Sequence, residues 1–202
     1  MTEMKEAVLL TALRLFARDG YEATPVSAIA GALGVSKGAL YRHYASKRDI
    51  FDQIVARMAA CDAERARAFS MPEGTLAQMQ SAYADTTIKQ IIAYAKGQFR
   101  YWAQDEFAAL FRKMLTLEQY RSAEMMRLYQ QYLAAGPLDY MTDLLRGAGL
   151  SQPRERAAAF YAPLFLLLSV YDGAQDKAAV TALTDDCLTQ LGKALGEEKR
   201  CT

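Results

Sequence analysis

The sequence has little of what catalytic proteins require. Its 202 residues include three cysteines, Cys61, Cys187 and Cys201, which are far apart, odd in number and match no metal-ligand spacing. They are expected to be core or surface thiols in a reducing cytosol. The only histidine is His43, and neither a glycine-rich phosphate loop nor a nucleophile motif is present. We therefore expect no catalytic residue, no metal and no cofactor, and predict that the protein is not an enzyme.

Paired carboxylates are the remaining sign of an enzyme. The pairs Asp105-Glu106 and Asp185-Asp186 are adjacent in sequence, so their side chains do not face each other on one side of a helix. They are interpreted as solvated surface. Hydrolytic or metal chemistry would have to be demonstrated by turnover.

Long hydrophobic runs are also missing. The longest uncharged apolar run, residues 157–171, is shorter than the roughly 20 residues of a membrane span, and Pro163 interrupts it. At the N-terminus, Glu3 and Glu6 precede any apolar run, which is not typical of a secretory signal. These features predict a soluble, cytoplasmic protein with no membrane association.

The net charge is only +1, which argues against a binder of polyanions over its whole surface. Any affinity for nucleic acid must come from a local basic patch. Hydrophobic residues make up 52% of the chain, enough for a substantial core, and the length allows a small domain fused to a medium one.

What the sequence does contain is a helix–turn–helix pattern between Pro25 and Tyr44. Gly34 lies where a sharp turn favours a positive φ, and Ser36 is a good N-cap for a second helix that begins at Lys37. Leu40 and Tyr44, four residues apart, anchor one face of that helix. Apolar residues at i, i+3, i+4 and i+7 form the stripe of the first helix: Val26, Ile29, Ala30 and Leu33. The second helix presents an outward face: Lys37, Gly38, Ala39, Tyr41, Arg42 and His43.

This outward face is basic and contains no acid. Four basic residues and one histidine lie between Lys37 and Arg48, and no acidic residue occurs between Pro25 and Arg48. A helix of this kind can enter the major groove, where a lysine in its first turn reaches guanine acceptors. The pattern favours DNA binding, although an ordinary helical hairpin with a solvated basic face is the alternative.

The N-terminal region resembles that of the tetracycline-repressor (TetR) family over roughly the first fifty residues. The similarity rests on the runs 15–21, 29–30, 33–38, 40–44 and 46–47 with Thr24. It implies that the early recognition-helix residues read bases, that Tyr41 and His43 contact the DNA backbone, and that Lys47 binds a phosphate. The predicted DNA-binding residues are thus Ser36, Lys37, Gly38, Ala39, Tyr41, Arg42, His43 and Lys47.

The rest of the chain has helical periodicity throughout, so the predicted fold is all-α. A three-helix DNA-binding domain, residues 1–46, is followed by a helical effector-binding and dimerisation domain, residues 47–202, and helix four, about 47–68, links the two. Ser46 and Asp49 form a capping-box pattern at the start of that helix. Further helices are expected at about 2–19, 75–102 with irregularity at Gly97, 106–117, 119–146 with a kink at Gly136-Pro137, from the Ser151 cap to 171, and 176–195.

The last two helices predict a two-fold homodimer. Fifteen uncharged residues lie between Arg156 and Asp172, apolar on every side, and such a helix must be covered on both faces. The alternative is the central helix of a monomer. The final helix carries one apolar stripe: Val180, Leu183, Cys187, Leu188, Leu191 and Leu195. Two copies would meet a palindromic DNA site in successive major grooves.

Aromatic residues are concentrated in the second domain, where 15 of the 21 lie between Tyr83 and Tyr171. They either fill the core or line an effector cavity, and the family resemblance implies a small-molecule effector. We expect an aromatic or lipophilic compound that controls a repressor; the alternative is a constitutive or architectural DNA-binding protein with no effector. The candidate pocket residues are Tyr83, Tyr94, Phe99, Trp102, Phe107, Phe111, Tyr129, Tyr132 and Phe165.

Overall fold

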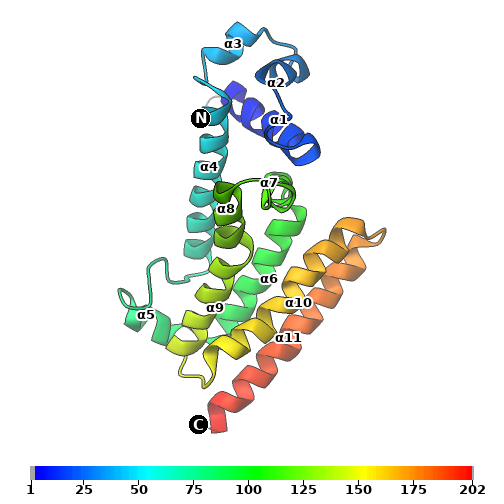
Figure 1. Ribbon diagram of the computed structural model, residues 1–202. Helices are drawn as coiled ribbons and strands as arrows, with labels where there is room; N and C mark the ends of the chain where they lie inside the picture. Colours follow the sequence, from blue (N-terminus) through cyan, green and yellow to red (C-terminus); the bar gives the residue numbers. More distant parts are fainter. Residues whose placement is uncertain (1–2, 202) are drawn as a thin grey trace. The chain divides into compact units, whose positions relative to one another are not determined.

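A computed structural model describes residues 3–201, with the side chains of residues 3–197. Within that range the chain folds into eleven helices and no strand, which confirms the all-α prediction (Figure 1). The helices form two compact units. One contains the described residues up to Asp62 together with Glu106–Tyr129, and the other contains Ala63–Asp105 together with the described residues from Gln130 onward.

The first unit holds the helix–turn–helix. Its elements are α1 (Glu3–Asp19), α2 (Val26–Ala32), α3 (Lys37–Tyr41), most of α4 (Lys47–Ala68), α7 (Glu106–Glu118) and the start of α8 (Ala123–Leu133). The predicted bounds of the first and fourth helices are confirmed to within a residue. At the start of α4, the Ser46 hydroxyl accepts from the Asp49 N–H at 3.0 Å, while the Asp49 carboxylate accepts from the Ala45 N–H at 2.9 Å.

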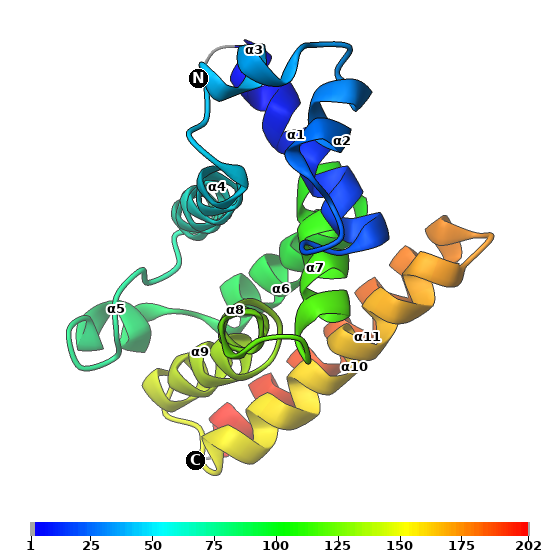
Figure 2. The same cartoon turned by 45° about the horizontal axis from the view of Figure 1, so that its top comes forward.

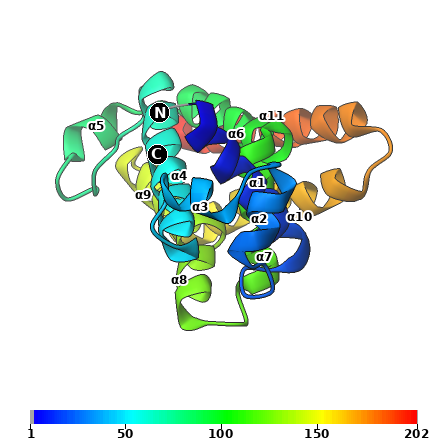
Figure 3. The same ribbon diagram turned by 90° about the horizontal axis from the view of Figure 1, so that it is seen from above.

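The core of this unit includes a helix that is distant in sequence. Leu9, Leu13 and Phe16 of α1 are fully buried, as their helical spacing predicts. A three-helix domain alone buries little surface and is only marginally stable. Here α7 packs along α1 and brings the buried Phe111 and Leu115 to the core (Figure 3). The DNA-binding helices are therefore supported by α7 as well as by α4.

The second unit contains α5 (Gln80–Asp85), α6 (Ile88–Gln104), α9 (Ala135–Gly147), α10 (Pro153–Gly173) and α11 (Lys177–Cys201). The last two helices run antiparallel, side by side (Figures 1 and 2). α6 packs on α11, where Arg100 forms an ion pair with Asp185 and the Lys96 ammonium donates to the Thr189 hydroxyl at 2.8 Å. These polar contacts fix the register of the two helices.

Several predicted helix boundaries were wrong. The helix expected over 75–102 is broken before Thr87, because Thr87 and Gln90 form a capping box, and α6 then continues through Gly97. The helix expected over 119–146 breaks at Ala134, not at Gly136-Pro137, because proline is tolerated in the first turn of α9. Gln152, with a φ of 48°, takes the N-cap position expected for Ser151.

The compact units divide the chain differently from the predicted functional domains. The prediction separates residues 1–46 from 47–202, whereas the first unit also contains most of α4 and all of α7. That functional boundary remains a prediction. Cys61 and Cys187 are free, half-buried thiols, and the side chain of Cys201 lies outside the described residues. In the range that the structure covers, no helix is long and apolar enough to cross a membrane.

Candidate DNA-binding surface

The turn between α2 and α3 is fixed by its backbone. Gly34 has a φ of 66°, a left-handed conformation that side chains with a Cβ rarely adopt. The Val35 N–H donates to the Ala30 carbonyl at 3.0 Å, and Ile29 and Leu40 are buried below the turn. The two short helices are thus held at a set angle, as expected for a helix–turn–helix.

The α3 helix begins at the predicted cap. The Ser36 hydroxyl accepts a hydrogen bond from the Ala39 N–H at 3.1 Å, so Ser36 has a structural task at this surface. Ala39 is half-buried behind the exposed residues of the helix. Five of the predicted DNA-binding residues are exposed together on α3 and in the turn that follows it: Lys37, Gly38, Tyr41, Arg42 and His43.

Arg42, His43 and Tyr44 lie beyond the end of α3, which is shorter than expected. Tyr44 nevertheless anchors the segment, because its side chain is buried and its hydroxyl donates to the Lys5 carbonyl of α1 at 3.0 Å. Burial raises the pKa of Tyr44 to about 12. The Tyr44 hydroxyl therefore ties residues 37–44, the recognition segment, to α1.

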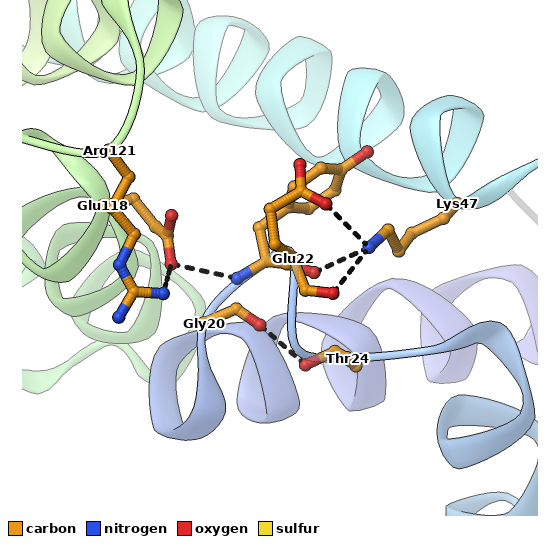
Figure 4. A network of polar contacts seen from close by, with 7 residues as sticks. Gly20, Glu22, Thr24, Lys47, Glu118 and Arg121 are labelled. Carbon is orange, nitrogen blue, oxygen red and sulfur yellow. Dashed lines mark hydrogen bonds and ion pairs between the residues drawn. The ribbon is translucent and has the colours of Figure 1, made fainter.

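Lys47 is the least accessible of the predicted DNA-binding residues that carry a charge. Its ammonium donates to the carbonyls of Tyr21 and Glu22 at 2.8 and 3.3 Å and lies 3.8 Å from the Glu22 carboxylate (Figure 4). It also lies 4.4 Å from the centre of the Tyr21 ring, and its side chain is 21% exposed. Lys47 therefore connects the first residue of α4 to the turn between α1 and α2.

The basic patch is smaller than the sequence suggests, because Arg48 is paired internally. Its guanidinium binds both carboxylate oxygens of Glu124 in α8 at 2.7 Å and Asp52 at 2.8 Å. The hydrogen bonds to Glu124 raise the pKa of Arg48, and those from Arg48 lower the pKa of Glu124. The cations that face solvent on the recognition segment are Lys37 and Arg42.

The nine candidate pocket residues are divided between the two units. Phe107, Phe111 and Tyr129 belong to the first unit, where they are buried. Phe165 lies on the outer face of α10 and is 42% exposed. In the second unit, the buried or half-buried candidates are Tyr83, Tyr94, Phe99, Trp102 and Tyr132.

The ring contacts in the second unit include Phe69 and Tyr140, which are not among the predicted pocket residues. Tyr140 contacts Tyr83 and Tyr94, with ring centres 6.2 and 6.1 Å apart, and Phe69 contacts Tyr94 at 5.7 Å. The hydroxyl groups of Tyr140 and Tyr83 donate to the carbonyls of Pro72 and Gly74, both at 2.8 Å. Burial raises the pKa of Tyr140. These tyrosines hold the segment between α4 and α5, which is a structural function that spacing in sequence does not reveal.

A metal site is not apparent in the part of the chain that the structure describes, since no group of three or more His, Cys, Asp or Glu side chains is placed to hold an ion. The acidic pairs do not converge either. Asp185 is paired with Arg100, and Glu106 is paired with Arg14 of α1 at 2.7 Å.

Residues 8–54 match the family described as bacterial regulatory proteins, tetR family. The uncharacterized HTH-type transcriptional regulator YerO of Bacillus subtilis is 49% identical over 47 residues, which are 23% of this chain and 16% of that protein. The HTH-type transcriptional regulator AcrR of Shigella flexneri is 42% identical over 52 residues, 26% of this chain and 24% of that protein. The matched segment thus spans a quarter or less of these relatives and coincides with the helix–turn–helix and its flanking helices.

Over most of its length the chain has the fold of several solved structures. SmeT in complex with triclosan superposes with a TM-score of 0.61 at 17% identity, over 94% of this chain and 91% of that chain. SmeT is the repressor of the multidrug efflux pump SmeDEF of Stenotrophomonas maltophilia. Residues 8–54 of this chain thus belong to the tetR family of bacterial regulatory proteins, and the chain as a whole has the fold of the SmeT structures.

Proposed function

We propose that the protein is a transcriptional repressor that binds a palindromic operator in double-stranded DNA as a homodimer and responds to a small-molecule effector. A regulator of this kind is a transcription factor and not an enzyme, and it acts in the cytoplasm, where the chromosome is. The observation that carries the proposal is the acid-free surface of the recognition segment. Lys37, Gly38, Tyr41, Arg42 and His43 are exposed there, on α3 and in the turn that follows it, and the angle of α3 is fixed by its neighbours.

Each exposed residue is assigned a contact with DNA that suits its side chain. Lys37, in the first turn of α3, reaches the acceptors of guanine in the major groove. A Cβ at Gly38 would lie 4.0 Å from the Ser36 Oγ, in ordinary contact, and its absence allows the backbone to approach the bases closely. Tyr41, Arg42 and His43 donate to phosphate oxygens and set the register of the protein on the duplex. Lys47 adds a phosphate contact at the start of α4.

The proposed dimer uses the outer faces of α10 and α11. The exposed residues of α10 within the uncharged run form one continuous stripe: Ala158, Ala159, Ala162, Phe165, Leu166, Ser169 and Val170. On α11 the apolar stripe expected from the sequence is divided, because Val180, Leu188 and Leu195 are buried within the protomer while Leu183 is 56% exposed. The α11 contribution to the interface therefore centres on Leu183. A second copy is the occupant proposed for this face, since a two-fold pairing covers it on both protomers.

The effector is proposed to be a neutral or weakly polar aromatic or lipophilic compound. The family relationship and the triclosan complex of SmeT support this class, as do the aromatic side chains of the second unit, which offer apolar faces with polar tips. The effector binds better to a form in which α4 is displaced. In that form the recognition helices of the two protomers no longer match successive major grooves. A coupling of about 1–3 kcal/mol, typical of such systems, changes DNA affinity by about 5- to 150-fold.

Selection of genomic fragments by the purified protein tests the proposal. We expect a palindromic sequence whose half-sites are about 34–36 Å apart, or slightly more, bound at least about 10³-fold more tightly than random DNA. Triclosan and a panel of other apolar aromatic compounds should release it. An architectural protein would show no preferred sequence. A constitutive repressor would bind the palindrome, and no compound of the panel would release it. No binding to any fragment at low salt would refute DNA binding itself.

A further inference from the structure

The turn between α1 and α2 is held from two sides by residues far away in the sequence. The Tyr21 N–H donates to a carboxylate oxygen of Glu118 in α7 at 3.1 Å, and the Tyr21 carbonyl accepts from the Lys47 ammonium of α4 at 2.8 Å (Figure 4). The ring of Tyr21 packs on Phe16 and Phe51, with ring centres 5.1 Å apart in both pairs. One residue of the turn therefore joins α7 to α4.

Glu118 occupies a position that its own helix does not favour. It is the last residue of α7, where the helix dipole is unfavourable for an anion. Its side chain is only 2% exposed, and burying a carboxylate is costly without compensating hydrogen bonds. The Tyr21 N–H and the Arg121 guanidinium, at 3.2 Å, supply such bonds. The location of Glu118 is thus explained by the turn that it binds.

The turn itself leaves space for this carboxylate. Gly20 has a φ of 94°, and a Cβ at this position would lie 2.6 Å from Glu118 Oε1 and from Arg121 Nη1. Any other residue would therefore push the carboxylate away from Tyr21. Inside the turn, the Thr24 hydroxyl donates to the Gly20 carbonyl at 2.8 Å and is itself buried. The contact with α7 is built into the turn and does not arise from a flexible surface side chain.

Two other ion pairs join the DNA-binding helices to α7 and α8, but both are solvent-exposed. Arg14 pairs with Glu106 and Arg48 pairs with Glu124, with side chains that are each at least one-third exposed. Pairs of this kind contribute little, because solvent screens them. In contrast to these two pairs, the contact of Glu118 with the Tyr21 N–H uses a carboxylate whose side chain is buried.

We infer that Glu118 is a positioning residue for the DNA-reading helices. Its carboxylate holds the α1–α2 turn on α7, and through Tyr21 and Lys47 it sets the start of α4 directly after the recognition segment. α7 is then a second element, beside α4, whose movement alters the DNA-bound geometry. When Glu118 is lost, the fraction of molecules with that geometry falls and the apparent affinity falls with it. This inference rests on the proposed function.

The test compares Glu118→Ala and Glu118→Gln with Glu106→Ala, a matched change at the other end of α7 that leaves Tyr21 untouched. Binding is measured to the genomic fragment that the wild type retains most tightly and to random DNA of equal length, below the melting temperature of each variant. Amide exchange at Tyr21 is the structural readout. Glu118→Asp, one methylene shorter, withdraws the carboxylate from Tyr21 and serves in place of Glu118→Ala if that variant does not fold.

Glu118→Ala should speed exchange at Tyr21 and weaken binding to the selected fragment by about tenfold, while binding to random DNA changes less than about twofold. Glu118→Gln keeps an acceptor oxygen and should restore both readouts to near the wild-type level, and Glu106→Ala should change neither. Unchanged Tyr21 exchange, or an unchanged ratio of specific to random binding in Glu118→Ala or Glu118→Asp, would overturn the inference. Failure of the wild type to retain any fragment would instead refute the proposed function.

Discussion

Replacing Leu183 with aspartate should dissociate the proposed dimer. The Leu183 side chain is 56% exposed in the protomer, so covering it with a second copy contributes about 1 kcal/mol of apolar burial. An aspartate there loses this contribution and adds a buried charge with no cation one helical turn away, where Ala179, Asp186 and Cys187 lie, which costs at least another ~1 kcal/mol. Two-fold symmetry doubles the change, because each copy carries the substitution. The dissociation constant should therefore rise by about a thousandfold or more.

Sedimentation of the full chain at micromolar concentration measures this effect. Tyr120→Asp is the matched control, because Tyr120 is 84% exposed in the turn between α7 and α8 and lies outside the proposed interface. The control should sediment as the wild type does, and Leu183→Asp should sediment as a monomer with weakened binding to the palindrome. A Leu183→Asp protein that remains a dimer, with the wild-type dissociation constant, would show that the outer faces of α10 and α11 do not form the interface.

Three further predictions concern the DNA-binding unit. Lys47→Ala should weaken binding to every DNA and reduce by about one the slope of log affinity against log salt concentration. It should also reduce the melting temperature, because the bonds to the Tyr21 and Glu22 carbonyls are lost. An unchanged salt slope would assign Lys47 to structure alone. Lys37→Ala should relax base preference at one position by about 1–3 kcal/mol with little effect on random DNA, as measured by competition binding, and equal losses on both DNAs would contradict base reading. The pKa of Tyr44 is about 12 in the folded protein and its ordinary value is 10.0, so the contribution of Tyr44 to stability is complete below pH 10 and is lost as the pH rises toward 12. Tyr44→Phe should therefore make the denaturation midpoint less dependent on pH between pH 10 and 12.

The helix–turn–helix was predictable because its signals are local. Gly34 at the turn and Ser36 at the cap act within a few residues of themselves, and the structure confirms both. Apolar spacing also identified the buried face of α1. Such features depend on backbone geometry and on residues one turn away, so the sequence contains all the information needed.

The supporting contacts were not predictable, because they join residues that are far apart in the chain. Tyr21 and Glu118 are separated by 97 positions, and Arg48 and Glu124 by 76. No pattern near Arg48 indicates that its charge is already paired, so the sequence overstated the basic patch. Similarly, an aromatic residue in a helix has the same sequence signal whether it packs in a core, as Phe111 does, or faces outward, as Phe165 does.

The internal pairing of Arg48 bears on how the protein finds its target in a cell. A chromosome offers a vast excess of sites that attract any free cation, and each available cation strengthens that indiscriminate attraction through the counterions it displaces. A guanidinium already engaged by Glu124 and Asp52 contributes less to it. Fewer molecules are then sequestered along irrelevant DNA, and a small number of copies suffices to keep one operator occupied.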